Sequence, residues 1–267
     1  MASARPPRDP PHISVHIATL GAGPDLVLIH GWAMHGGVFA SLADVLATQF
    51  RLHVVDLPGH GYSRDDARFD VADCARRIAD ATPRALWIGW SLGGLVALRA
   101  ALDAPQQVRG LVVIASSPRF VSAPDWKYGV AANVFAEFDV ELRHRTRHAI
   151  ERFLALETMG SAHPQTQLRD LKKHVFERGD PGVDALADGL RALAAGDLRA
   201  DIAHLTMPSL WIAGRRDRLV PPAAMAWSAA QAPRGRYLEF NSGHAPFISH
   251  PVGIAAAIGA FAVELPG

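Results

Sequence analysis

The alternation of short apolar segments with helical patterns restricts the fold of this chain more than any other feature. Six apolar segments, each ending in turn residues, have the composition of buried strands: 25–31, 51–61, 85–91, 108–117, 207–217 and 235–244. Helical patterns lie among them at 37–48, 70–81, 92–103 and 222–232. This order predicts an α/β protein with a doubly wound, mostly parallel sheet, whose ligands bind at the carboxyl ends of the strands.

One long segment interrupts this alternation. Between about Pro118 and Asp201 we find only helical patterns, in "RHAIERFLALETM", "QTQLRDLKKHVFERG" and "VDALADGLRALAAG". We therefore predict a core made of residues 1–117 and 201–267, with a helical cap inserted at 118–200. The cap should cover the site at the carboxyl ends of the strands.

Composition excludes several classes of protein. The 267 residues carry a formal net charge of +1, which gives no reason to expect nucleic acid or a membrane as partner. Cys74 is the only cysteine, so an internal disulfide is excluded and a reducing compartment is favoured. Residues 1–14 lack the apolar run of a signal peptide, and we interpret them as a flexible lead-in. We expect a cytoplasmic monomer without metal or cofactor.

Ser91 lies where an apolar, strand-forming run meets a helical pattern, in "LWIGWSLGGLVAL". With Gly89 and Gly93 it forms the pattern G-x-S-x-G, which is typical of a nucleophile elbow. A Cβ atom at either glycine would collide with a neighbouring strand or helix. The turn would hold the serine hydroxyl over the sheet, at a helix N-terminus with free N–H groups. A glycine-bracketed serine can also be a simple turn, so this interpretation depends on partners.

A serine hydroxyl becomes a strong nucleophile only when a base takes its proton and an acid orients that base. In folds with this elbow the chain order is serine, acid, histidine. Asp217 and His244 follow the last two predicted strands in that order, so we predict a Ser91–Asp217–His244 triad. Asp217 alone could be a surface acid paired with a neighbouring arginine. His250 is the nearest rival base, but it precedes Pro251 and should begin the last helix.

Ester hydrolysis also needs hydrogen-bond donors for the tetrahedral oxyanion. One should be the backbone N–H of Leu92, directly after the serine. The other should come from the turn after "LVLIHG", where Trp32 is the candidate. We interpret His30 in that turn as a structural hydrogen-bonding residue. The turn "DLPGHGYS" at 56–63 should lie near the site without supplying an ionisable group to the chemistry.

Five segments together resemble the α/β-hydrolase superfamily: "HGW", "DLPGHGYS", "GWSLGG", "GRRDRLVP" and "SGHAPFISHP". A closer resemblance, carried by "GWSLGGLVAL", "ERFLALETMG" and "HAPFISHP", is to the pimeloyl-[acyl-carrier protein] methyl ester esterases of biotin synthesis. It implies a cytoplasmic carboxylesterase with the triad and oxyanion donors named above. It also implies a cap segment lining the acyl channel, made of Phe153, Leu154, Ala155, Leu156 and Glu157.

The same resemblance implies that basic residues of the cap receive the acidic acyl-carrier protein. Arg152 and Arg169 match that pattern, whereas His148 stands where an arginine is expected, with Arg147 beside it. Arg143 and Arg147 are four residues apart, which on one helix would bring like charges together. Such a cluster can also be an ordinary solvated helix face.

Other activities stay open at this point. Lactonases, thioesterases and carbon–carbon bond hydrolases use the same triad, because the cap determines the substrate. A non-catalytic ligand receptor on the same scaffold would keep these residues as well. Dehalogenases and epoxide hydrolases are disfavoured, since they need a carboxylate where Ser91 stands.

Overall fold

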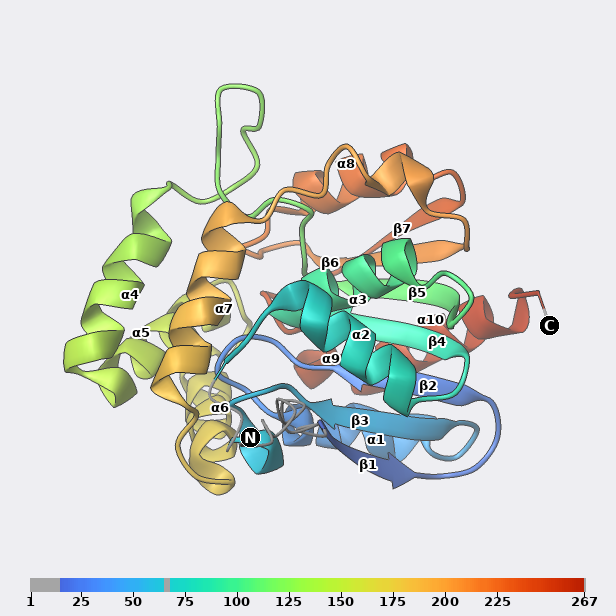
Figure 1. The fold of residues 1–267 in the computed structure, drawn as a ribbon, viewed down its shortest axis with the longest axis horizontal. Coiled ribbons are helices and arrows are strands. Elements are labelled where there is room, and N and C mark those ends of the chain that lie inside the picture. Colours follow the sequence, from blue (N-terminus) through green and yellow to red (C-terminus); the bar gives the residue numbers. More distant parts are fainter. Residues whose placement is uncertain (1–14, 65–67, 267) are drawn as a thin grey trace, which may run out of the picture.

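The computed structural model describes residues 15–64 and 68–266, and its centre is a single sheet (Figure 1). The strands described are β1 (His16–Leu20), β2 (Asp25–Ile29), β3 (Arg51–Asp56), β4 (Ala85–Trp90), β5 (Val108–Ile114), β6 (Ser209–Gly214) and β7 (Gly235–Phe240). They lie in the order β1-β3-β2-β4-β5-β6-β7. Neighbouring strands are parallel except β1, which is antiparallel to β3. The predicted α/β fold with a mostly parallel sheet is confirmed.

Each apolar segment indicated by the sequence contains one of the strands β2–β7. The central strands are apolar on both faces because helices cover both, and in β4 every residue is buried. β1 is a strand that the apolar pattern does not reveal. It lies at the edge of the sheet and its five residues are half-buried or exposed, so its sequence shows no continuous apolar run.

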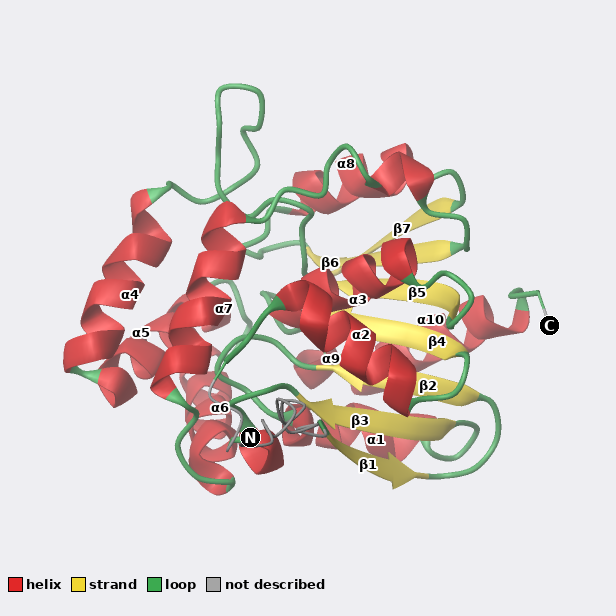
Figure 2. Ribbon diagram, viewed as in Figure 1, coloured by secondary structure: helices red, strands yellow, loops and turns green. Residues whose placement is uncertain are grey.

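Helices cover the two faces of the sheet (Figure 2). One face carries α2 (Val71–Ala81), α3 (Leu92–Asp103) and α8 (Pro222–Gln231), and the other carries α1 (Ala40–Leu46), α9 (Pro246–Ser249) and α10 (Pro251–Val263). The side chain of Asp70 accepts the N–H of Asp73 and so caps the start of α2. Cys74 and Ile78, four residues apart on that helix, face the core. These helices agree with the predicted patterns.

Four more helices lie together beyond the carboxyl ends of the parallel strands (Figure 1). They are α4 (Asn133–His144), α5 (Thr146–Thr158), α6 (Pro164–Glu177) and α7 (Val183–Ala195). Residues 118–201 are all described, and they contain isolated β-bridges but no strand. The three predicted helical patterns correspond to α5, α6 and α7, and α4 is additional. The boundaries of the cap at 118 and 200 stay a prediction.

Two buried carboxylates, Asp56 and Asp188, connect the helices of this segment to the α/β core. Asp56, at the end of β3, lies 2.9 Å from Arg178, which follows α6. Burial alone would raise the pKa of Asp56, but two backbone N–H donors and the Arg178 guanidinium lower it. Asp188 of α7 similarly accepts from the guanidinium of Arg68 and from the N–H of Phe69. Asp56 therefore holds α6 and its own turn in place.

No helix in the described part of the chain is long and apolar enough to cross a membrane. The predicted lead-in at 1–14 lies outside the described residues.

Candidate active site

Ser91 occupies a strained turn between β4 and α3. Its φ of 53° and ψ of −120° are rare for a residue with a side chain, and such conformations cost about 1–3 kcal/mol. An ideal Cβ atom placed on Gly89 would overlap the backbone of Gly93, and one placed on Gly93 would overlap the backbone of Ile29. The expected need for both glycines is therefore confirmed. Ser116 also stabilises the turn, because its hydroxyl donates to the Ser91 carbonyl at 2.7 Å.

The structure brings the three predicted triad residues together at the carboxyl ends of their strands. His244 Nε2 lies 2.9 Å from Ser91 Oγ, and His244 Nδ1 lies 2.8 Å from Asp217 Oδ2. All three side chains are buried. This geometry allows the imidazole to accept the serine proton while the carboxylate fixes its orientation.

Backbone N–H groups hold Asp217, and no arginine of the described residues pairs with it. Its Oδ1 accepts from Leu219 N at 2.8 Å and from Val220 N at 3.0 Å, which leaves Oδ2 for the imidazole. The rival base His250 precedes α10 and lies 2.8 Å from Ser249 Oγ, as expected of a residue that begins the last helix.

Trp90 fixes the loop that carries His244, a role that the sequence did not indicate. Its indole Nε1 donates to the His244 carbonyl at 2.9 Å, and its ring centroid lies 5.7 Å from the imidazole. Its position directly before Ser91 was the only signal available in the sequence.

Burial lowers the pKa of His244, but the Asp217 carboxylate more than offsets it through charge and a hydrogen bond, so the pKa is raised above 6.5. Because protonated His244 cannot accept the Ser91 proton, kcat/KM should fall as the pH drops through this raised pKa. When kcat/KM for p-nitrophenyl butyrate is measured from about pH 5 to about pH 9, the midpoint of the acid limb should lie above ~6.5, the ordinary pKa of a histidine. A limb below that value would contradict the assignment of His244 and Asp217.

Both predicted oxyanion donors border the nucleophile. Leu92 is the first residue of α3, so its N–H has no partner within the helix. An ideal Cβ atom on Gly31, next to Trp32, would lie 3.1 Å from Ser91 Cβ, which places this turn against the serine. In the described residues neither the Leu92 nor the Trp32 backbone N–H donates to another group. The Trp32 indole instead fixes the turn by donating to Leu186 O at 2.8 Å.

His30 fits its predicted structural role. Its Nε2 accepts the N–H of Leu57 at 2.9 Å, and its Nδ1 lies 2.8 Å from the carbonyl oxygen of Gly31. Burial lowers the pKa of His30 to about 3, so the ring is neutral at physiological pH.

The cap segment implied by the resemblance lies partly at the site. Phe153 and Leu154 are buried, and the Phe153 ring packs on Trp32 with centroids 4.6 Å apart. Ala155 and Leu156 are half-buried. Glu157 is buried, and its Oε1 lies 3.9 Å from His244 Nε2. Neither carboxyl oxygen of Glu157 has a hydrogen-bond partner among the described residues. Burial raises the pKa of Glu157 to about 8.

The expected like-charge pair of Arg143 and Arg147 is wrong, because these residues lie on different helices. Arg145 leaves the helical conformation with φ −146° and ψ 62°, and Thr146 Oγ1 donates to Leu142 O at 2.9 Å at that break. Arg143 therefore ends α4 while Arg147 begins α5.

The three predicted docking arginines differ in how they are paired. Arg147 lies 2.7 Å from Asp180 and over the ring of Phe176. Arg152 pairs with Glu141 and lies over the ring of Phe138. Arg169 keeps 78% of its side chain exposed, and its ion pair with Asp170 is long, at 3.9 Å. Arg169 is therefore the most available of the three to a partner.

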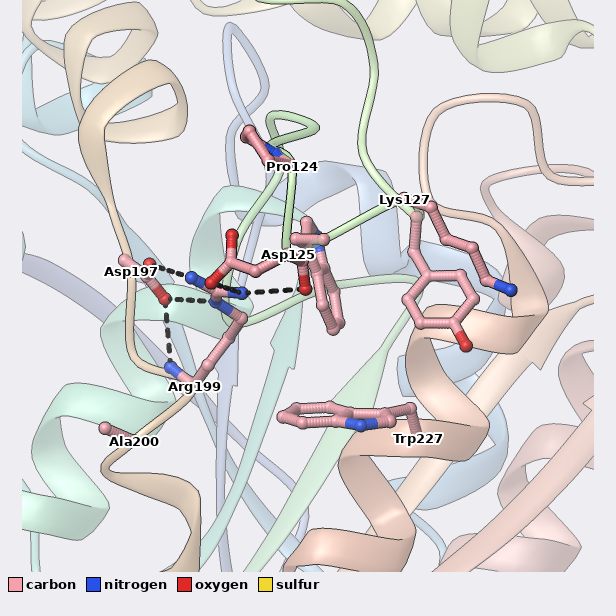
Figure 3. A pocket seen from close by; sticks show the side chains of 9 residues that line it. Pro124, Asp125, Lys127, Asp197, Arg199, Ala200 and Trp227 are labelled. Atoms are coloured by element: carbon pink, nitrogen blue, oxygen red, sulfur yellow. Dashed lines mark hydrogen bonds and ion pairs between the residues drawn. The ribbon is translucent and has the colours of Figure 1, made fainter.

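A cavity of about 730 Å³ lies away from the triad, under the loop that precedes α4 (Figure 3). Its aromatic walls include Trp126 and Trp227, and Arg199 in its lining forms ion pairs with Asp125 and Asp197. None of the triad residues lines it. Throughout residues 15–64 and 68–266, no group of three or more His, Cys, Asp or Glu side chains is placed to hold a metal ion.

Comparison with known proteins decides the family. A family model described as "alpha/beta hydrolase fold" matches residues 24–251. The chain belongs to the α/β-hydrolase family. Over 94% of its length this α/β hydrolase is 50% identical to the "Pimeloyl-[acyl-carrier protein] methyl ester esterase" of Xanthomonas axonopodis pv. citri (strain 306), and it covers 100% of that protein. It is 53% identical to the protein of the same name from Stenotrophomonas maltophilia (strain R551-3), with 94% and 97% coverage. The resemblance stated from the sequence is confirmed.

Solved structures of other α/β hydrolases share the fold. An esterase from Exiguobacterium antarcticum matches with a TM-score of 0.83 and 19% identity, covering 92% of this chain and 94% of its own. An enol-lactonase from Burkholderia xenovorans LB400 matches with a TM-score of 0.81 and 20% identity, covering 94% and 96%. At such identities the likeness concerns the fold alone.

Proposed function

We propose that this α/β hydrolase is a serine carboxylesterase that removes the methyl ester from pimeloyl-[acyl-carrier protein], a step of biotin synthesis. The observation that carries the proposal is the hydrogen-bonded series from Ser91 through His244 to Asp217, buried at the carboxyl ends of the strands. The substrate follows from relatives at 50% and 53% identity that bear the name of this activity.

In the first half of the reaction, Ser91 Oγ attacks the carbonyl carbon of the methyl ester while its proton passes to His244 Nε2. Asp217 stabilises the imidazolium that forms. The backbone N–H groups of Leu92 and Trp32 hold the oxyanion of the tetrahedral intermediate, a contribution of about 2.7–4 kcal/mol for each donor. Methanol then leaves with the proton from His244, and the acyl group stays on Ser91.

In the second half, a water molecule attacks the acyl carbon and gives its proton to His244. Ser91 Oγ leaves with that proton, which regenerates the enzyme. The far end of the pimeloyl chain carries the thioester to the acyl-carrier protein throughout. The released product is therefore pimeloyl-carrier protein with a free carboxylate.

The cap supplies the apolar part of the acyl channel in this proposal. We propose that Phe153, Leu154, Ala155 and Leu156 of α5 line this channel; Phe153 packs on Trp32, and each methylene group of the acyl chain that such residues bury contributes about 0.8 kcal/mol. The acidic carrier protein docks on the exposed basic side chains of the cap. We propose that the protein acts as a monomer, since a single copy supplies the triad and both predicted oxyanion donors.

Arg169→Glu should lower kcat/KM for the carrier-bound methyl ester by roughly fivefold, because an exposed charge pair contributes up to about 1 kcal/mol. Turnover of p-nitrophenyl butyrate should not change. In high salt the parent and Arg169→Glu should have similar kcat/KM values for the carrier-bound ester, because the Debye length falls to roughly 3 Å at 1 M. The measurement is kcat/KM for both substrates at low and high salt.

Arg84→Glu is the matched control for this charge reversal. Arg84 is also exposed, but it precedes β4 at the opposite end of the sheet. Equal losses in the two variants would mean that only net charge matters. If Arg169→Glu keeps the parental kcat/KM for the carrier-bound ester, the basic residues of α6 form only an ordinary solvated face.

The experiment that tests the proposed function compares methyl pimeloyl-carrier protein with free dimethyl pimelate. We expect a much higher kcat/KM for the carrier-bound ester. Equal values would indicate a general short-chain esterase. A protein that binds both esters but hydrolyses neither of them, and that does not hydrolyse p-nitrophenyl butyrate either, would be a receptor.

A further inference from the structure

Glu157 is the one buried carboxyl group of the site that the steps above do not use. It lies on α5, its side chain is fully buried, and both of its oxygens lack a hydrogen-bond partner among the described residues. Leaving a buried polar group unpaired costs about 1–3 kcal/mol, and more when the group is charged. Such a cost calls for an explanation, and the imidazole of His244, the base of the triad, lies 3.9 Å from this carboxyl.

The end of α5 is docked so that this carboxyl stays in place. Gly160 has a φ of 84° and packs so closely on the backbone of Arg216 that a Cβ atom could not fit. An ideal Cβ atom on Gly243 would lie 3.1 Å from the carbonyl oxygen of Met159. Arg216 N in turn donates to Ser242 O at 2.9 Å. The residues after Glu157 therefore pack against the loops that carry Asp217 and His244.

Glu157 and His244 are close enough for one oxygen atom to form a hydrogen bond with each of them. Oε1 and Nε2 are 3.9 Å apart, and an oxygen atom that forms hydrogen bonds of about 2.8 Å to both can lie between them. During hydrolysis the attacking water must lie next to Nε2, because it gives its proton to that atom.

We infer that Glu157 holds the hydrolytic water on His244 during breakdown of the acyl-enzyme. One hydrogen of the water points to His244 Nε2 and the other to a carboxyl oxygen of Glu157, which leaves a lone pair for the acyl carbon. The new carbon–oxygen bond forms as the first proton moves to Nε2. That proton then leaves on Ser91 Oγ when the acyl bond breaks, and Glu157 exchanges no proton.

A neutral carboxyl group is suited to this position. Because burial keeps Glu157 protonated at neutral pH, its carbonyl oxygen still accepts a hydrogen bond without placing a second full charge beside Asp217 and His244. The inference rests on the proposed serine esterase mechanism, since it needs an acyl group on Ser91.

The test separates formation of the acyl-enzyme from its breakdown, using p-nitrophenyl butyrate in rapid mixing and acid-quenched intact-protein mass spectra. p-Nitrophenolate leaves without a proton from His244, so acylation should be insensitive to Glu157. In Glu157→Leu, deacylation should slow roughly 10- to 100-fold, the loss of one hydrogen bond to a reacting atom. kcat and KM should fall together while kcat/KM stays unchanged, and acyl-Ser91 should accumulate.

Glu157→Gln keeps an acceptor oxygen and should deacylate within a few-fold of the parent. Thr158→Val is the matched control, because Thr158 is also buried at the end of α5 but donates to Ala155 O within the helix. If Glu157→Leu folds poorly, Glu157→Met repeats the test with an unbranched apolar side chain.

Parent-like deacylation in Glu157→Leu would overturn the inference. An equal loss of acylation and deacylation would also overturn it, because the residue would then act only on the shape of the site. If the parent releases no p-nitrophenolate and forms no adduct on Ser91, the proposed function itself fails.

Discussion

Replacing Ser91 with alanine is expected to lower kcat by about 10⁶-fold, the size of effect seen when the nucleophile of a triad is lost. His244 then has no hydroxyl to deprotonate, although Leu92 and Trp32 can still hold an oxyanion. The fold should survive, because alanine keeps the Cβ atom and meets the same strain at φ 53°. Hydrolysis of p-nitrophenyl butyrate and the thermal unfolding midpoint measure the two effects.

Ser228→Ala is the control for this variant. Ser228 is equally buried, but its hydroxyl donates to Ala224 O within α8 and has no contact with the triad. It should keep parental activity. Residual activity of more than a few per cent in purified Ser91→Ala would contradict the assignment of the nucleophile.

Asp217→Asn should lower kcat by roughly 10⁴-fold with little change in the fold. An asparagine oxygen can still accept the N–H groups of Leu219 and Val220, so the loop should hold its shape. The amide nitrogen would face His244 Nδ1, however, and a donor there favours the tautomer that has its proton on Nε2. That tautomer cannot accept the proton of Ser91.

The same substitution should move the acid limb of kcat/KM to lower pH, because the carboxylate that raises the pKa of His244 is gone. Asp25→Asn is the control, since Asp25 pairs with Arg51 at the far end of the sheet. A loss of activity in Asp217→Asn without a shift of the limb would mean that Asp217 only supports the loop. His250→Ala should be near parental, and a loss equal to that of His244→Ala would mean that the base is misassigned.

The core of the fold and the arrangement of the triad follow from local sequence signals. Strands β2–β7 are short apolar runs, and Ser91, Asp217 and His244 each follow one of them directly or within a few residues. Because parallel strands end at one edge, residues after those ends must come close together. Predicting that the triad residues meet therefore required only the correct order of strands and helices.

The parts that the sequence did not reveal depend on contacts between distant segments. Arg147 looks like one member of a basic run because its partner Asp180 lies 33 residues away in the chain. β1 has no apolar run because its five residues are half-buried or exposed at the edge of the sheet. Glu157 entered only through the resemblance, and its approach to His244 depends on how α5 docks on the loops after β6 and β7.

The measurement that tests the central claim most directly is the mass of the carrier protein after incubation of methyl pimeloyl-carrier protein with the enzyme. Attack on the methyl ester predicts a carrier lighter by one CH₂ group, with methanol released and the thioester intact. The parent should give this product and Ser91→Ala should not. A carrier that loses the whole acyl group and gains a free thiol would identify a thioesterase instead, and a carrier of unchanged mass would contradict the proposed substrate.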